Sequence, residues 1–188
     1  MKTCDLHIID EKAALLTATS DFIFDHPEPC YQEFQSAEYL MQALEKEGFR
    51  IEDGLANIKT AFSATYGSGR PIIGILGEYD ALSGLNQVAG CTVPCVDKEK
   101  TNGHGCGHNL LAAASMGAAI AVKDYLQTHR CSGTVVFLGC PAEEGGSAKA
   151  FMARDGVFDD LDVALTWHPD DTTGIRMNTS LANVQVLY

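Results

Sequence analysis

The spacing of apolar and polar residues along the chain predicts an α/β fold. Residues 9–25 and 33–47 carry apolar side chains at helical intervals, and the two prolines in the intervening segment HPEPCY predict a break. Gly48 is the expected end of the second helix. Two apolar runs follow, FSATYG and PIIGILGEYD, and the turn signal GSGR between them predicts strand, turn and strand.

The second half of the chain alternates between predicted strands and helices. Residues 83–107 form a long polar, Gly-rich loop that leads into a helix over residues 109–128, where Gly117 suggests close packing against a sheet. The segment GTVVFLGC predicts a buried strand, residues 147–154 a short helix, and DVALTW a last strand. This order predicts a mostly parallel or mixed sheet with helices on both faces, in which ligands gather at the carboxyl ends of the strands.

Composition narrows the classes of partner and compartment. The chain has 13 basic and 25 acidic residues, a formal charge of -12, which disfavours nucleic acid and anionic membranes as partners. Its longest apolar stretches are shorter than the roughly 20 residues that span a bilayer, so no membrane segment is expected. Seven cysteines, an odd number, and an N-terminus without an apolar signal region indicate a reducing cytoplasm.

The segment GHGCGHN is the densest candidate for metal chemistry. It presents His104, Cys106 and His108 directly before a predicted helix, and imidazole and thiolate are good ligands for zinc and related metals. A Gly-rich turn with incidental histidines would give the same short motif. On this motif alone the two interpretations stay open.

Acidic residues and a further histidine follow the other predicted strands. In CPAEEGG, one of the adjacent Glu143 and Glu144 could bind a cation while the other, pointing elsewhere, acts as general base; the alternative is a pair of acids favoured by a helix N-terminus. His168 in TWHP could be structural, and Glu78 and Asp80 in GEYDALSG could ligate a metal or orient a histidine. Because all these groups end strands of one sheet, together they indicate a metal-dependent hydrolase.

The four motifs, in this order, resemble the M20 metallopeptidase family and its aminoacylase, carboxypeptidase and amidohydrolase branch. The resemblance extends from about Phe24 to the end of the chain. It implies two divalent metal ions, zinc or manganese, with Glu143 as general base, Asp80 supporting the metal site, and four ligands: Cys106, His108, Glu144 and His168. Where the wider family has a further histidine ligand, this chain has Glu78, whose role the resemblance leaves open, and His104 is expected to be a loop residue.

The resemblance also sets expectations for the whole protein. Family members hydrolyse N-acyl or N-aroyl amino acids, are roughly twice as long, and form homo-oligomers or assemble with a paralogous subunit. We therefore expect residues 1–172 to be the first part of the catalytic domain and residues 173–188 to lead into a dimerisation domain. On this view the chain lacks the last histidine ligand and is inactive alone. Two alternatives are a non-catalytic metal-binding or assembly module, and a thiol enzyme that pairs Cys106 with His108.

Overall fold

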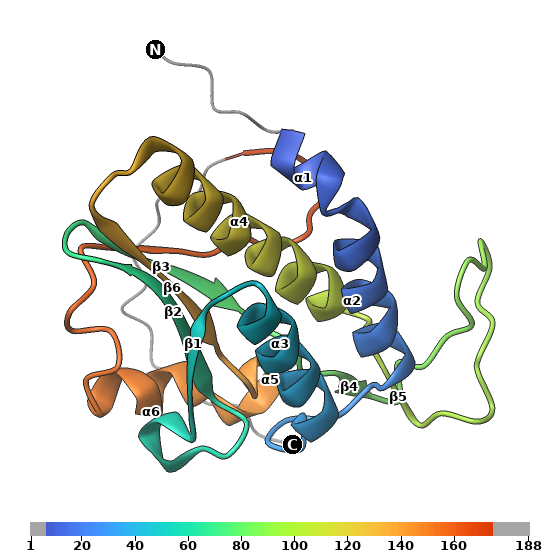
Figure 1. The fold of residues 1–188 in the computed structure, drawn as a ribbon. Coiled ribbons are helices and arrows are strands. Elements are labelled where there is room, and N and C mark those ends of the chain that lie inside the picture. The colour runs from blue at the N-terminus through green and yellow to red at the C-terminus, as the bar shows by residue number, and fades with distance from the viewer. Residues whose placement is uncertain (1–6, 175–188) are drawn as a thin grey trace.

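The computed structural model describes residues 7–174, which form a five-stranded mixed sheet with helices on both faces (Figure 1). The three strands at one side of the sheet run parallel to each other, and the remaining two are antiparallel to their neighbours. In spatial order the strands are β1 (Arg50–Asp53), β2 (Phe62–Ser68), β6 (Gly133–Gly139), β3 (Ile72–Gly77) and β7 (Val163–Leu165). The predicted α/β class and mixed sheet are confirmed.

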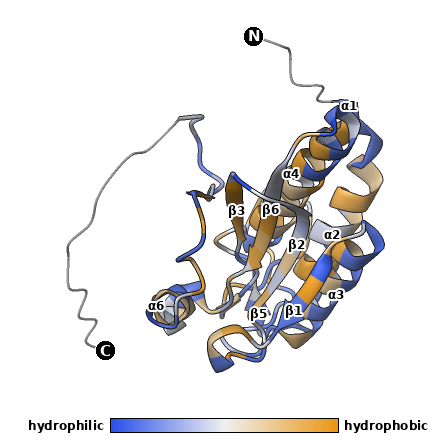
Figure 2. Ribbon diagram, turned by 60° about the vertical axis from the view of Figure 1, so that its left-hand side comes forward, coloured by the Kyte–Doolittle hydropathy of each residue, from blue (hydrophilic) through white to orange (hydrophobic). Residues whose placement is uncertain are grey.

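The helices cover the sheet from two sides (Figure 2). One side carries the short α1 (His7–Glu11) and three longer helices, α2 (Ala13–Asp25), α3 (Phe34–Lys46) and α4 (His108–His129). The other side carries α6 (Ala148–Arg154), which follows the four-residue α5 (Glu143–Gly146).

Alternating residues of β6 explain why both faces need cover. Val135 and Phe137 belong to the buried cluster that includes residues of α3 and α4, whereas Val136 and Leu138 pack in a second cluster with Met152 of α6. Burying each such side chain contributes about 1.5–3 kcal/mol. A strand that is apolar on both faces is therefore stable only between two helical layers.

Several details differ from the sequence-based expectation. The segments on either side of GSGR do form strands β2 and β3, but these do not pair with each other, because β6 lies between them. Lys12 separates α1 from α2 where one helix was predicted. α4 packs against β3 and β6 as predicted, but Gly117 itself lies against Leu16 of α2, where an added Cβ would be 2.9 Å from Leu16 Cδ1, so this glycine serves helix–helix contact.

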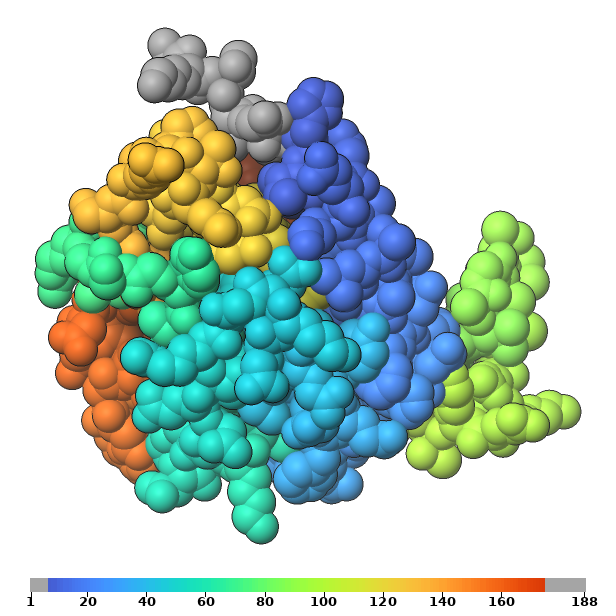
Figure 3. All heavy atoms as spheres, viewed as in Figure 1, coloured from blue at the N-terminus to red at the C-terminus, as the bar shows by residue number. Residues whose placement is uncertain are grey.

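Short elements also appear where none was predicted. They are β1, the 3₁₀ turn η1 (Leu55–Asn57), and the two-residue strands β4 (Leu82–Ser83) and β5 (Asn102–Gly103). The last two pair with each other at the base of the long loop, which extends away from the body of the molecule (Figure 3). This base fixes the start of the segment that leads into α4.

The remaining sequence-based expectations concern the tail and membranes. Of residues 173–188, which are expected to lead into a dimerisation domain, all but the first two lie outside the described residues. Among residues 7–174, no helix is both long enough and apolar enough to cross a bilayer.

Candidate metal centre

The predicted functional clusters meet at one edge of the sheet. Because β3, β6 and β7 are parallel, the segments that follow them emerge on the same side, and α4 begins there as well. Asp80 follows β3, Glu143 and Glu144 follow β6, and His168 follows β7. The topology therefore confirms the prediction that strand ends bring these groups together.

His108 occupies the centre of the group and is completely buried. Its Nδ1 lies 3.0 Å from both the carboxylate Oδ1 and the backbone oxygen of Asp80. Both of those oxygens can only accept, so Nδ1 carries a proton and, in the neutral imidazole that binds metals, Nε2 holds the lone pair. Burial lowers the pKa of His108, but the hydrogen bond and charge of Asp80 outweigh it and raise the pKa overall.

Asp80 connects the histidine to the acidic turn. Its Oδ1 accepts from His108, and its Oδ2 accepts a hydrogen bond from the backbone N–H of Glu144 at 2.8 Å. Burial raises the pKa of Asp80, but these two hydrogen bonds outweigh it and hold the pKa below its usual value. The carboxylate is thus ionised and keeps the imidazole in one tautomer and one orientation, the usual role of an acid behind a metal-binding histidine.

The lone pair on His108 Nε2 faces three carboxylates. Oxygen atoms of Glu78, Glu143 and Glu144 lie 3.3, 3.9 and 3.9 Å from it. Nε2 and Glu144 Oε1 are both buried and have no hydrogen-bond partner. Buried polar atoms are rarely left unsatisfied, and a divalent cation would satisfy both atoms at once. The residues present therefore fit a metal ion.

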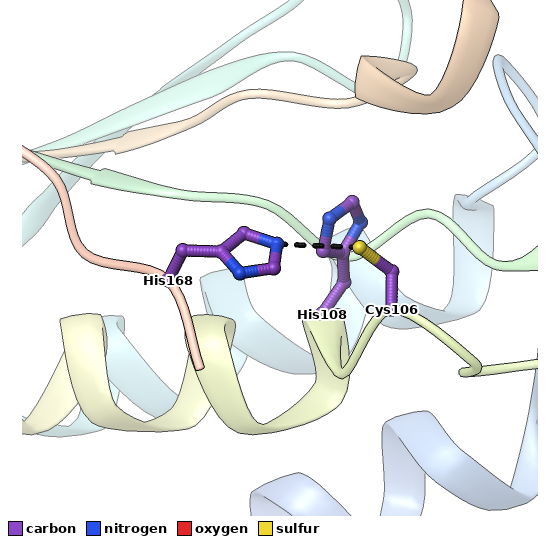
Figure 4. A group of neighbouring side chains, drawn as sticks. All are labelled: Cys106, His108 and His168. Atoms are coloured by element: carbon purple, nitrogen blue, oxygen red, sulfur yellow. Dashed lines mark hydrogen bonds between the residues drawn. The ribbon is translucent and has the colours of Figure 1, made fainter. Parts of the chain in front are cut away.

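Cys106 and His168 lie beside His108 and are further candidate ligands (Figure 4). Cys106 Sγ lies 3.2 Å from His168 Nε2, and one ligand atom from each of Cys106, His108 and His168 falls within 4.8 Å of the others. Burial and the nearby carboxylates, chiefly Glu144, raise the pKa of Cys106 to about 12. A nucleophilic cysteine requires a lowered pKa, so this environment argues against the thiol-enzyme hypothesis.

Glu143 differs from Glu144 mainly in exposure. The side chain of Glu143 is 42% exposed and that of Glu144 19%, although both reach the same distance from His108, contrary to the expectation that they point in different directions. Burial and the charge of Glu78 raise the pKa of Glu143 above its usual value. A carboxylate with solvent access and a raised pKa is suited to accept a proton from water.

Lys149 and Glu78 form an ion pair that the sequence did not indicate. Lys149 Nζ of α6 lies 2.5 Å from Glu78 Oε1, which leaves the other oxygen of Glu78 facing His108. No motif singled out Lys149, because the direction of a long side chain depends on how α6 packs. His104 lies apart from this group, with its Nε2 3.0 Å from the carbonyl oxygen of Ile23, in agreement with its assignment as a loop residue.

The fold and the site define a class of protein. A mixed α/β domain that gathers a thiol, two imidazoles and several carboxylates at the carboxyl ends of its strands is the architecture of a metallohydrolase domain. The profile of peptidase family M20/M25/M40 matches residues 74–181, more than half of the chain, and the chain belongs to that family.

Curated relatives are similar along most of the chain. It is 54% identical to a subunit of p-aminobenzoyl-glutamate hydrolase from Escherichia coli over 169 residues, which cover 90% of the chain and 35% of the relative. Identity to human Xaa-Arg dipeptidase is 32%, covering 90% of the chain and 38% of that protein. N-acetyl-L-cysteine deacetylase of Bacillus subtilis is 28% identical, over 86% of the chain and 39% of the relative. The chain thus spans little more than a third of the length of these relatives.

Solved structures share the fold. A dinuclear metal-binding peptidase of the M20 family from Bacillus subtilis superposes with a TM-score of 0.69 at 25% identity, covering 84% of this chain and 43% of that one. An aminobenzoyl-glutamate utilization protein from Klebsiella pneumoniae gives a TM-score of 0.61 at 18% identity, covering 86% and 44%. The second likeness concerns the fold alone.

Proposed function

We propose that this chain forms the metal-binding and proton-transfer part of an amidohydrolase that cleaves N-acyl or N-aroyl amino acids. Family membership supports the reaction class, and the identity of 54% to a subunit of a p-aminobenzoyl-glutamate hydrolase supports the substrate class. A deacetylase of an N-acetyl amino acid and a dipeptidase, both named among the relatives, also cleave an amide bond next to an amino acid.

The observation that carries the proposal is the pair of unsatisfied atoms, His108 Nε2 and Glu144 Oε1. We propose two divalent ions, zinc or manganese, held by Cys106, His108, Glu144 and His168. Thiolate and imidazole favour zinc, whereas carboxylates admit manganese. When bound, such ions act as Lewis acids that polarise a carbonyl group and lower the pKa of water.

The other side chains of the site have separate roles in proton transfer and in positioning the ligands. Glu143, partly exposed beside the ligands, accepts a proton from the attacking water and returns it to the leaving amine. Asp80 keeps the His108 lone pair directed at the metal position. Lys149 holds Glu78 next to the same nitrogen, so that the acidic cluster keeps a fixed geometry in spite of its mutual repulsion.

Replacing Glu143 with Gln tests the assignment of the base. The assay uses a protein that contains residues 1–188. We expect its rate of amide hydrolysis to fall by about 100-fold or more, since general-base catalysis contributes a rate enhancement of roughly 10²–10⁴-fold. Zinc content, measured by atomic absorption, should stay unchanged. Glu52→Gln, an exposed change on β1, is the control and should alter neither quantity.

The outcomes separate the two functions that remain. If Glu143→Gln leaves hydrolysis intact, Glu143 is not the base; if the wild-type protein binds metal but hydrolyses no N-acyl amino acid, a metal-binding module is the better description.

We further propose that the protein acts in the cytoplasm as an oligomer, with residues 1–172 as its metal-binding part and residues 173–188 leading into a dimerisation domain. The resemblance in the motifs supports these boundaries, and the E. coli relative is itself named as a subunit. Light scattering on the polypeptide that carries these residues should give the mass of at least two chains; a single-chain mass would contradict the proposal.

A further inference from the structure

Glu33 is a wholly buried carboxylate with three hydrogen-bond donors around it. It lies in the turn between α2 and α3, far in sequence from the metal ligands. Its Oε1 accepts from the backbone N–H groups of Tyr31 and Ala142 at 2.8 and 2.9 Å, and its Oε2 accepts from the hydroxyl of Thr60 at 2.9 Å. Each of these donors is neutral, so the buried carboxylate is held by hydrogen bonds alone.

The contact with Ala142 links Glu33 to the catalytic turn. Ala142 immediately precedes Glu143 and has a φ of 55°, a left-handed conformation that is unfavourable for a residue with a Cβ. Such a conformation persists only where surrounding contacts enforce it. The hydrogen bond from Ala142 N–H to Glu33 is one such contact, and it fixes the peptide from which Glu143 and Glu144 project.

The same segment also contacts the far end of the turn. The hydroxyl of Tyr31 donates to the carbonyl oxygen of Gly146 at 2.5 Å, while Tyr79 donates to the carbonyl oxygen of Thr60 and so fixes the residue that binds Glu33. Residues 31–33 therefore hold both ends of the turn that spans residues 142–146. Between those ends, Asp80 accepts the N–H of Glu144.

We propose that Glu33 is a positioning residue for the acidic turn, holding the Ala142 peptide so that Glu143 and Glu144 face His108. This inference rests on the proposed function of those two glutamates. The role needs an acceptor for two N–H groups and a partner for one hydroxyl. Glutamine meets the same needs, because its carbonyl oxygen accepts both N–H groups and its amide donates to Thr60. Alanine meets none of them.

The experiment compares Glu33→Ala with Glu33→Gln. The first readout is hydrogen exchange over residues 141–147 in the absence of metal, where we expect faster exchange in Glu33→Ala and nearly wild-type exchange in Glu33→Gln. The second is zinc affinity by competition with a chelator. The third is hydrolysis by the polypeptide that carries these residues. We expect Glu33→Ala to lower zinc affinity and kcat by about 10–100-fold with KM little changed, as for other residues that support a metal site.

A matched control separates positioning from general destabilisation. Ala43→Gly weakens the interior of α3 without contacting the Glu33 network, and it should lower Tm yet leave exchange at residues 141–147, zinc affinity and kcat unchanged. Wild-type values in Glu33→Ala would overturn the inference, as would losses in Glu33→Gln equal to those in Glu33→Ala. Absence of hydrolysis in the wild-type protein would instead refute the proposed function.

Discussion

At the scale of single residues, the site depends on the pairing of His108 with Asp80. Asp80 is 1% exposed and uses one oxygen for the imidazole and the other for the Glu144 N–H. The two hydrogen bonds need two acceptor oxygens, which a carboxylate provides and an amide does not. The pairing thereby links a candidate ligand on α4 to a candidate ligand after β6.

Replacing Asp80 with Asn tests this link. The amide offers one oxygen to His108, and its NH₂ group then faces the Glu144 N–H, so two donors oppose each other. We expect zinc affinity to fall by about 10–100-fold, measured by calorimetry at constant pH. Asp53→Asn, an exposed change at the end of β1, is the control. Equal zinc affinity in Asp80→Asn and the wild type would show that Asp80 does not orient the ligands.

At the scale of elements, Glu47 connects the helices on one face of the sheet through two ion pairs. It caps α3 and accepts from Lys12, between α1 and α2, and from Lys123 of α4 at 2.5 and 3.3 Å. Burial raises the pKa of Glu47, but the hydrogen bonds from the two ammonium groups outweigh it and lower the pKa below its ordinary value of 4.5. A lowered pKa means that the contact stabilises the fold above pH 4.5 and is lost as the pH falls through the folded-state value.

Urea unfolding of Glu47→Gln at two pH values tests that ion-pair network. At pH 7 we expect the free energy of unfolding to fall by about 1.5–3 kcal/mol, the range for hydrogen bonds to charged groups. The wild-type carboxylate takes up a proton as the pH falls through its lowered folded-state pKa, so the difference between the two proteins should shrink in the second measurement, made below that pKa. A difference of the same size at both pH values would mean that the charge of Glu47 contributes nothing.

A comparison of elements also shows which parts of the fold could be predicted from the sequence. The strands that lead to Asp80, Glu143 and His168 were recognisable because a short apolar run followed by polar residues is a local pattern. The order of the strands was not, since the insertion of β6 between β2 and β3 depends on a crossover through α4. Glu33 was missed for the same reason: its partner Ala142 lies 109 positions away.

At the scale of the whole molecule, the candidate functional residues lie together at one edge of the sheet. Both faces of β6 are used for packing, so the polar groups that the chain places at strand ends are confined to the carboxyl edge, where α4 also begins. The molecule thus separates a core that gives stability from a rim that carries the candidate metal ligands and acidic residues. The proposed function depends above all on the binding of a metal ion by Cys106 and His108 at that rim.

Cobalt titration of the 188-residue chain, followed by visible and near-ultraviolet absorbance, tests this metal binding most directly. We predict a thiolate-to-cobalt charge-transfer band in the wild-type chain that disappears in Cys106→Ser. Cys91→Ser is the control, because Cys91 and Cys95 are neighbours on the long loop and could also chelate. The band should persist in that control. A cobalt spectrum that lacks the band in the wild type, or keeps it in Cys106→Ser, would contradict the proposed metal centre.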